Sequence, residues 1–251
     1  MKLLIDIGNT CLKWASAQQG QLSPQQRITH HGRDVMPSLA EHWHALPIPE
    51  QGVFISSVAH PLYVQQIRDF CQQQWQCEPV LIRSTAQFGQ IRSAYPQPER
   101  LGVDRWLALI GAWFVLEGRS CCVVDCGTAI TLDVLTSDGQ HQGGLILPGI
   151  GKMHQILAQD THALGQYHRD PPPLSPDSPL LANHSQHAIQ LGIYYAVIGL
   201  IEHVTAAYSA DPLQLILTGG AATLLRSALP THCHYWPDLV LQGLLKASEL
   251  Q

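Results

Sequence analysis

The same short turn occurs twice in this 251-residue chain, each time directly after an apolar run typical of a buried β-strand. The two copies are Asp6-Ile7-Gly8-Asn9-Thr10 and Asp125-Cys126-Gly127-Thr128-Ala129. In each copy the glycine lets the backbone approach a ligand, hydroxyl and N–H groups can bind phosphate oxygens, and the aspartate can hold a neutralising cation. The repeat therefore predicts an α/β chain of two similar halves, whose facing turns would bind a nucleotide polyphosphate.

Hydrophobic periodicity predicts the same plan in both halves. In the first half we expect a strand at Lys2–Ile5 with Cys11–Gln18 as its hairpin partner, further strands at Gly52–Val58 and Pro79–Ile82, and helices at Leu62–Trp75 and Leu101–Gly118. In the second half we expect strands at Ser120–Asp125, Ile130–Thr136, Gly143–Pro148 and Leu213–Leu217, and helices at Ile150–Gln159 and Ala188–Tyr208. A proline-rich stretch, Pro171–Pro179, is expected to be an exposed loop that acts as a linker, with a lid or a contact with a partner as the alternative.

Composition excludes several classes of function. The net charge of −5 argues against nucleic-acid binding, which needs a basic face. No unbroken apolar span of about 20 residues is visible, so a membrane role is not expected. The start, Met1 to Asp6, places an acid where a signal peptide would continue to be apolar, which favours a cytoplasmic protein.

Cysteine and histidine are frequent but suggest no metal centre. The seven cysteines include no Cys-x-x-Cys pair and are typical of reduced thiols in a cytosolic protein. None of the fourteen histidines lies beside a cysteine or carboxylate at the spacing of a metal site.

Phosphoryl transfer depends on positioning and charge neutralisation, and donors for both lie near the first turn. Asn9 adds an amide, and Lys13 places an ammonium on the following strand, where it can reach phosphate oxygens. The alternative for Lys13 is an ordinary lysine at a strand edge. Similarly, Thr218-Gly219-Gly220-Ala221-Ala222 can pass under an adenine or be a plain turn between a strand and a helix.

A third segment, Gly102-Val103-Asp104-Arg105-Trp106, begins a helical pattern. Asp104 in isolation is as well explained as a helix cap. Next to Arg105, however, it suits catalysis, because the acid can accept a hydroxyl proton while the guanidinium holds a carboxylate. The pair predicts a kinase that acts on a small hydroxy acid.

Taken together, these segments make the chain resemble the type III pantothenate kinases, a branch of the actin-like, acetate-and-sugar-kinase superfamily, over nearly its whole length. The matching segments are Asp6-x-Gly8-Asn9-Thr10 with Lys13, Ser56-Ser57-Val58, Gly102-x-Asp104-Arg105, Asp125-x-Gly127-Thr128-Ala129, Gly143-Gly144 with Pro148-Gly149, Thr218-Gly219-Gly220, and Pro237 to Leu244.

The resemblance implies an α/β fold of two ribonuclease-H-like (actin-like ATPase) domains, residues 1–117 and 118–251, with mixed sheets flanked by helices. It implies a cytoplasmic homodimer that phosphorylates pantothenate with ATP in the first step of coenzyme A biosynthesis. It also implies two cations, a monovalent K⁺ or NH₄⁺ and a divalent Mg²⁺.

Site residues follow from the same resemblance. Asp104 is implied to be the general base, Asp125 to hold the monovalent cation, and Asp6 to be a candidate Mg²⁺ ligand. The residues implied to bind ATP are Asp6, Gly8, Asn9, Thr10, Lys13, Gly127 and Thr128. The residues implied to bind pantothenate are Tyr95, Gly102, Val103, Asp104, Arg105 and Ser185.

One departure affects Ser185. The family usually has Asn-Thr-x-x-Ala-Ile before the long helix of the second half, whereas this chain has His184-Ser185-Gln186-His187-Ala188-Ile189. Ser185 keeps the hydroxyl of the family's threonine, and His184 replaces the asparagine.

Two alternatives to a pantothenate kinase remain at this stage. The same fold can phosphorylate another small hydroxylated acid or a sugar, although Arg105 argues against a neutral sugar. It can also be a non-catalytic accessory protein. The joint presence of Asp6, Asp104, Arg105 and Asp125 argues against a protein without catalytic activity.

Overall fold

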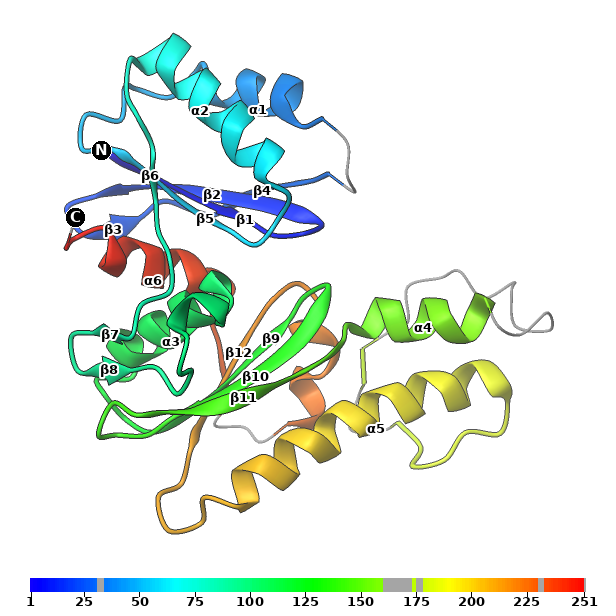
Figure 1. Cartoon of the computed structure of the whole chain (residues 1–251). Coiled ribbons are helices and arrows are strands. Elements are labelled where there is room, and N and C mark those ends of the chain that lie inside the picture. The colour runs from blue at the N-terminus through cyan, green and yellow to red at the C-terminus, as the bar shows by residue number, and fades with distance from the viewer. Residues whose placement is uncertain (31–33, 160–172, 175–177, 230–232, 251) are drawn as a thin grey trace. The chain divides into compact units, whose positions relative to one another are not determined.

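The computed structural model describes residues 1–30, 34–159, 173–174, 178–229 and 233–250 (Figure 1). Most of the proline-rich stretch, including Pro171, Pro172 and Pro176, lies outside the described residues. Contacts divide the chain into two compact units: Met1–Glu117 with Asp238–Gln251, and Gly118–Pro237.

The first unit is built on a sheet with strand order β3-β2-β1-β5-β6, with β4 also pairing with β2. Its strands are β1 (Lys2–Ile7), β2 (Cys11–Gln18), β3 (Gln21–Leu22), β4 (Gln26–Thr29), β5 (Val53–Ser57) and β6 (Val80–Leu81). The pair β1–β2 is an antiparallel hairpin, whereas β5 runs parallel to both β1 and β6. This sheet is therefore mixed, and the expected hairpin after the first turn is confirmed.

Alternation along β1 decides which residues enter the core of the first unit. Leu3, Ile5 and Ile7 pack in one cluster with side chains of helices α1 (Met36–Trp43) and α2 (Pro61–Trp75). Asp6 alternates with them and so belongs to the other face of the sheet. The strand thus delivers a carboxylate to the face opposite α1 and α2.

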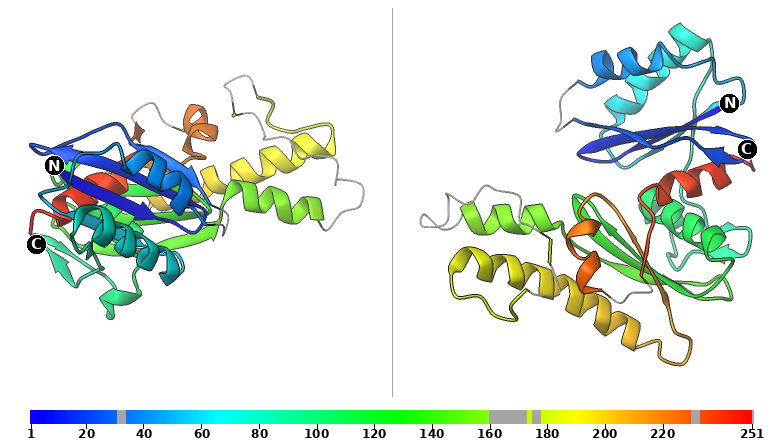
Figure 2. Two further views of the ribbon diagram at one scale, coloured as in Figure 1. Left: turned by 90° about the horizontal axis from the view of Figure 1, so that it is seen from above. Right: turned by 180° about the vertical axis from the view of Figure 1, so that it is seen from behind.

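Two further helices complete the first unit, α3 (Val103–Val115) and α6 (Leu239–Ala247), which lie side by side in Figures 1 and 2. The domain boundaries expected from the sequence, 1–117 and 118–251, assigned α6 to the second domain. The structure instead places it in the first unit, because α6 packs against α3 and also contacts β1. A small hairpin of β7 (Gln87–Phe88) and β8 (Ile91–Arg92) and the 3₁₀ turn η1 (Pro98–Arg100) precede α3.

The second unit repeats the plan with strand order β11-β10-β9-β12-β13. Its strands are β9 (Cys121–Cys126), β10 (Ala129–Leu135), β11 (His141–Pro148), β12 (Gln214–Thr218) and β13 (His234–Tyr235). As in the first unit, three consecutive strands form an antiparallel meander, and two later strands add in parallel beside the first of them. The predicted mixed α/β fold with sheets flanked by helices is confirmed.

Helices α4 (Ile150–Gln159) and α5 (Ser185–Ala206) contact each other in the second unit, and 3₁₀ turns η2 (Ala222–Leu224) and η3 (Arg226–Ala228) follow β12. The segment after β12 was expected to lead into a helix, and the helix there is the short 3₁₀ turn η2. Among the described residues, α5 has the length and apolar composition of a membrane span. This is a weak indication, because core helices of soluble proteins share both properties, and α5 contributes Leu191, Tyr194 and Val197 to the core of its unit.

Candidate active site

The first turn places its acid in a row of polar side chains across three strands. Asp6 pairs with Ser56 on β5 and with Lys13 on β2, so the three side chains share one face of the sheet. The Ser56 hydroxyl donates a hydrogen bond to Asp6 Oδ1 at 2.8 Å, and Asp6 is only 6% exposed. A buried carboxylate is thus oriented by a hydroxyl on one side and lies across from an ammonium on the other.

The turn itself is closed by backbone hydrogen bonds. The Gly8 N–H donates to the Cys11 carbonyl oxygen at 3.0 Å, which links the ends of β1 and β2. A β-carbon at Gly8 would lie 3.2 Å from that oxygen, so this position favours glycine. Asn9 is exposed at the tip, and Thr10 is partly buried beside it.

The second turn follows β9 and is enclosed by two other glycine segments. The Gly127 N–H donates to the Ala129 carbonyl oxygen, and the Gly149 N–H donates to that of Thr128, both at 3.0 Å. The Ala221 N–H donates to the Cys126 carbonyl oxygen at 2.9 Å. Three chain segments therefore meet at this turn, while Gly127 and Thr128 stay exposed.

Two glycines allow that close approach. A β-carbon at Gly149 would lie 2.6 Å from the Thr128 carbonyl oxygen. A β-carbon at Gly219 would lie 2.4 Å from Asp125 Oδ1, and Gly219 has φ +87°, which L side chains rarely adopt. Gly149 and Gly219 are therefore explained by the packing of backbone and carboxylate around the second turn.

The third group forms at the start of α3. Asp104 Oδ1 accepts a hydrogen bond from the Arg105 N–H at 2.8 Å and lies so close over Gly102 that a β-carbon there would be 2.6 Å away. The Arg105 side chain is 6% exposed, and its Nη1 donates to the Tyr95 hydroxyl at 3.0 Å, with the guanidinium 5.7 Å from the ring centre. Tyr95 and Arg105, ten residues apart, thus form one preorganised pair beside Asp104.

A cavity of about 200 Å³ borders this group. Gly102 and Val103 line it, as do Ser57, Arg83 and Arg100. The segment from Gly102 to Arg105, which is predicted to bind the substrate, therefore borders a cavity that is also lined by two arginines.

Ser185 belongs to a different element, the first turn of α5, where it is exposed. The preceding His184 caps this helix, because its Nδ1 accepts a hydrogen bond from the His187 N–H at 3.3 Å. A capping side-chain acceptor is also what asparagine supplies at this position. The departure from the family pattern at His184 therefore preserves the cap.

The structure thus collects the predicted site residues into groups. The first turn and the Tyr95–Arg105 group belong to the first unit, and the second turn and Ser185 belong to the second. Ser56 matched a family segment without an assigned role, and only the pairing of β1 with β5 reveals its bond to Asp6. Among the described residues, no three His, Cys, Asp or Glu side chains are grouped to hold a metal.

Cysteines lie close to the second turn, but they are poor nucleophiles. Burial raises the pKa of Cys121 and of Cys126 from 9.0 to about 12, and it also raises the pKa of Cys122. A shift of this size lowers the thiolate fraction at pH 8 about a thousandfold.

We therefore expect these three buried thiols to resist alkylation in the folded protein. Treatment with iodoacetamide at pH 8, followed by peptide mass spectrometry, should find label on the partly exposed Cys11, Cys77 and Cys233 first. All seven cysteines should react once the protein is unfolded in guanidinium. Rapid labelling of Cys126 in the native protein would contradict this expectation.

Comparisons with known proteins point to one family. The family model described as type III pantothenate kinase matches residues 2–207. The type III pantothenate kinase of Nitrosococcus oceani is 33% identical, covering 99% of this chain and 94% of the relative. That of Halorhodospira halophila is 36% identical, covering 98% and 96%.

Solved structures share the fold. A conserved Baf-family protein from Campylobacter jejuni has a TM-score of 0.62 at 20% identity, covering 99% of this chain and 100% of that chain. The activator of 2-hydroxyisocaproyl-CoA dehydratase from Clostridium difficile, solved with bound ADPNP, has a TM-score of 0.56 at 14% identity, covering 98% and 92%. Fold, matched segments and relatives agree, and the chain belongs to the type III pantothenate kinase family.

Proposed function

We propose that this protein is a phosphotransferase that uses ATP to phosphorylate the primary hydroxyl of pantothenate, giving 4′-phosphopantothenate, in the first step of coenzyme A biosynthesis. The observation that carries the proposal is the Tyr95–Asp104–Arg105 group at the start of α3, in a chain related over its full length to type III pantothenate kinases. Its acid, its guanidinium and its phenol hydroxyl match a substrate that offers a reacting hydroxyl and a carboxylate.

In this mechanism Asp104 orients the pantothenate hydroxyl and accepts its proton as the oxygen attacks the γ-phosphate of ATP in line. Arg105, already held by Tyr95, binds the substrate carboxylate without first losing much side-chain freedom. Gly102, Val103 and Ser185 complete the proposed pantothenate contacts.

The two turns bind the ATP phosphates in this proposal. The first contributes Asp6, Gly8, Asn9 and Thr10, with Lys13 across from Asp6, and the second contributes Gly127 and Thr128. Backbone N–H groups and hydroxyls at such turns are suited to phosphate oxygens. The Lys13 ammonium offsets the negative charge that gathers there.

The residues present fit a monovalent cation at Asp125. Thr218 is paired with Asp125 across β9 and β12, is 1% exposed, and its hydroxyl oxygen is buried without a hydrogen-bond partner. Because oxygen atoms are the ligands that K⁺ prefers, Asp125 and Thr218 together would hold K⁺ or NH₄⁺, which would spread charge near the phosphates. The oriented carboxylate of Asp6 is the proposed Mg²⁺ ligand.

The protein is proposed to act as a cytoplasmic homodimer without nucleic-acid or membrane partners. A cavity of about 580 Å³ between α4 and α5 is lined by apolar side chains, among them Met153, Ile156 and Ile193. Ile156 is 49% exposed in the chain alone. An apolar surface of this kind is consistent with association of two copies.

The first test is a coupled assay of ADP release with pantothenate and MgATP in potassium buffer. We expect turnover that requires pantothenate and that falls at least severalfold when sodium replaces potassium, because the smaller ion fits the same oxygens less well. Turnover that is equal with and without pantothenate would contradict the proposal.

The assay also separates the two alternatives. Binding of ATP without turnover of pantothenate would favour a kinase of another small hydroxy acid, and a panel of hydroxylated acids and sugars would then identify the substrate. A folded protein that does not bind ATP in the presence of K⁺ and Mg²⁺ would favour a non-catalytic accessory role.

A further inference from the structure

We propose that His30 is a positioning residue that sets the direction of the backbone N–H groups in the first phosphate turn. His30 directly follows β4 in the first unit and is 3% exposed. It lies outside the segments that carry the family resemblance. The proposal rests on the proposed function, since it concerns how the turn binds ATP.

His30 holds the turn at two points. Its ring Nε2 donates a hydrogen bond to the Gly8 carbonyl oxygen at 2.9 Å. A carbonyl oxygen can only accept, so this nitrogen carries a proton in both the neutral and the charged ring. Its backbone N–H donates to the Thr10 carbonyl oxygen at 2.8 Å. The carbonyls on both sides of Asn9 are therefore bound by one residue.

The hydrogen bond to the Gly8 carbonyl also fixes the direction of the next backbone N–H, that of Asn9. The described chain has no cis peptide bonds, and in a planar trans peptide the C=O and the following N–H point in opposite directions. Because the Gly8 carbonyl points to the His30 ring, the Asn9 N–H points away from it. The Asn9 N–H is thus directed to the side of the turn opposite the His30 ring, where it can donate to a bound anion.

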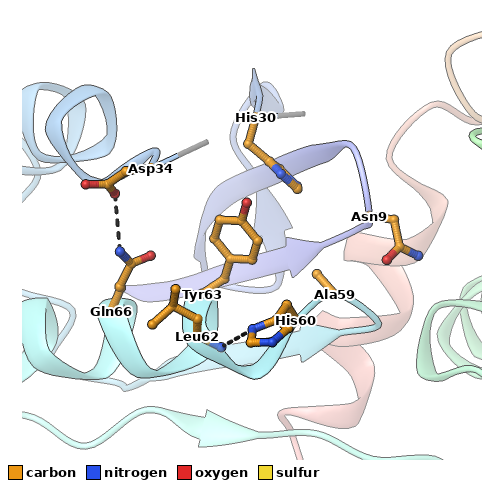
Figure 3. A pocket seen from close by; sticks show the side chains of 8 residues that line it. All are labelled: Asn9, His30, Asp34, Ala59, His60, Leu62, Tyr63 and Gln66. Atoms are coloured by element: carbon orange, nitrogen blue, oxygen red, sulfur yellow. Dashed lines mark hydrogen bonds between the residues drawn. The ribbon is translucent and has the colours of Figure 1, made fainter. Parts of the chain in front are cut away.

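The ring is itself held in place by Tyr63 of α2. The two ring centres are 4.5 Å apart at an interplanar angle of 50°, and Figure 3 shows the two side chains facing each other at the edge of a pocket of about 290 Å³. Tyr63 packs with Ile5 and Ile7, on the face of the sheet opposite Asp6. The His30 ring is therefore supported from the α2 side, away from the polar row that includes Lys13.

Glycine makes such a support necessary. Gly8 allows the close turn, but a glycine peptide can adopt many orientations, and freezing them costs free energy when ATP binds. A hydrogen bond from a buried ring fixes the orientation before the ligand arrives. Preorganisation of this kind increases affinity without adding a contact to the ligand.

Two substitutions separate the hydrogen bond from the packing. His30→Phe keeps an aromatic ring against Tyr63 and removes the donor, whereas His30→Gln loses the ring and keeps an N–H at a similar distance from the backbone. We expect His30→Phe to weaken MgATP binding about tenfold, which corresponds to the loss of one hydrogen bond, and His30→Gln to stay within about threefold of the natural protein. The KM for pantothenate should be unchanged within about twofold in both variants.

The readout is isothermal titration of the full-length protein with MgATP, combined with thermal unfolding. Leu39→Ala is the matched control, because Leu39 belongs to the same core cluster as Tyr63 and its truncation opens a cavity there without changing a residue of the turn. This variant should have a lower Tm and an unchanged affinity for ATP.

Three outcomes would overturn the proposal. They are wild-type affinity in His30→Phe, a loss of affinity in His30→Gln as large as that in His30→Phe, and a loss in Leu39→Ala equal to that in His30→Phe. Absence of MgATP binding in the natural protein would instead overturn the proposed function, and the role of His30 with it.

Discussion

Replacing Asp104 with asparagine is expected to lower kcat at least a hundredfold while leaving the fold intact. Asparagine has the same shape, and its side-chain oxygen can still accept the hydrogen bond from the Arg105 N–H and lie over Gly102. An amide cannot take a proton from the attacking hydroxyl, so only general-base catalysis, typically worth 10²–10⁴-fold, is removed.

The measurement is steady-state turnover of pantothenate together with thermal unfolding. We expect a Tm within about 2 °C of the natural protein and an unchanged affinity for MgATP. Asp69→Asn is the matched control, since Asp69 lies exposed on α2 and accepts a hydrogen bond only from Gln65 among the pairs described. Near-normal kcat in Asp104→Asn would rule out the role assigned to Asp104.

Elements with a strong hydrophobic period were predictable, whereas several short ones were not. The alternating pattern of Cys11–Gln18 predicted the hairpin, and α4 was predicted at the bounds observed. The strand pairs β7–β8 and β3–β2 involve two-residue strands, too short for any period to appear. Such strands form because partners are available in three dimensions, which local sequence does not encode.

Side chains that support the site escaped prediction for a similar reason. Ser56 is 50 residues from Asp6, and only the register of a parallel strand pair brings the two together. His30 is one of fourteen histidines, and its bond to Gly8 depends on the edge strand β4, which carried no strong signal. The glycine turns could be recognised in the sequence because the residues that form each turn are adjacent in the chain. The residues that orient the turns are distant in sequence and could not.

The position of α6 shows the same limit at the level of domains. The matched segment from Pro237 to Leu244 follows the second half in sequence, so the boundaries placed it there. Its packing is decided by a pair of glycines, Gly111 on α3 and Gly243 on α6, each of which faces the backbone of the other helix. Because α3 begins with the proposed catalytic group, this contact also supports the site.

Replacing Gly243 with alanine is therefore expected to destabilise the protein by about 3 kcal/mol or more, lowering the Tm by roughly 5–10 °C. A β-carbon there would lie 1.9 Å from the Leu107 carbonyl oxygen and 2.6 Å from its carbonyl carbon. These are backbone atoms of a buried helix, so no side-chain rotation relieves the overlap and α3 and α6 must separate. Alanine's better helix propensity, worth about 1 kcal/mol, offsets only part of this cost.

Gly199→Ala is the control for Gly243→Ala, because no loss of stability is expected at Gly199. Gly199 is an exposed position inside α5, and a β-carbon there meets nothing within 4 Å. Gly199→Ala should leave the Tm unchanged or raise it by a few degrees, because only helix propensity changes. Chemical denaturation of both variants measures the difference. A Gly243→Ala protein as stable as Gly199→Ala would show that the two helices of the first unit do not need this close contact to hold the start of α3.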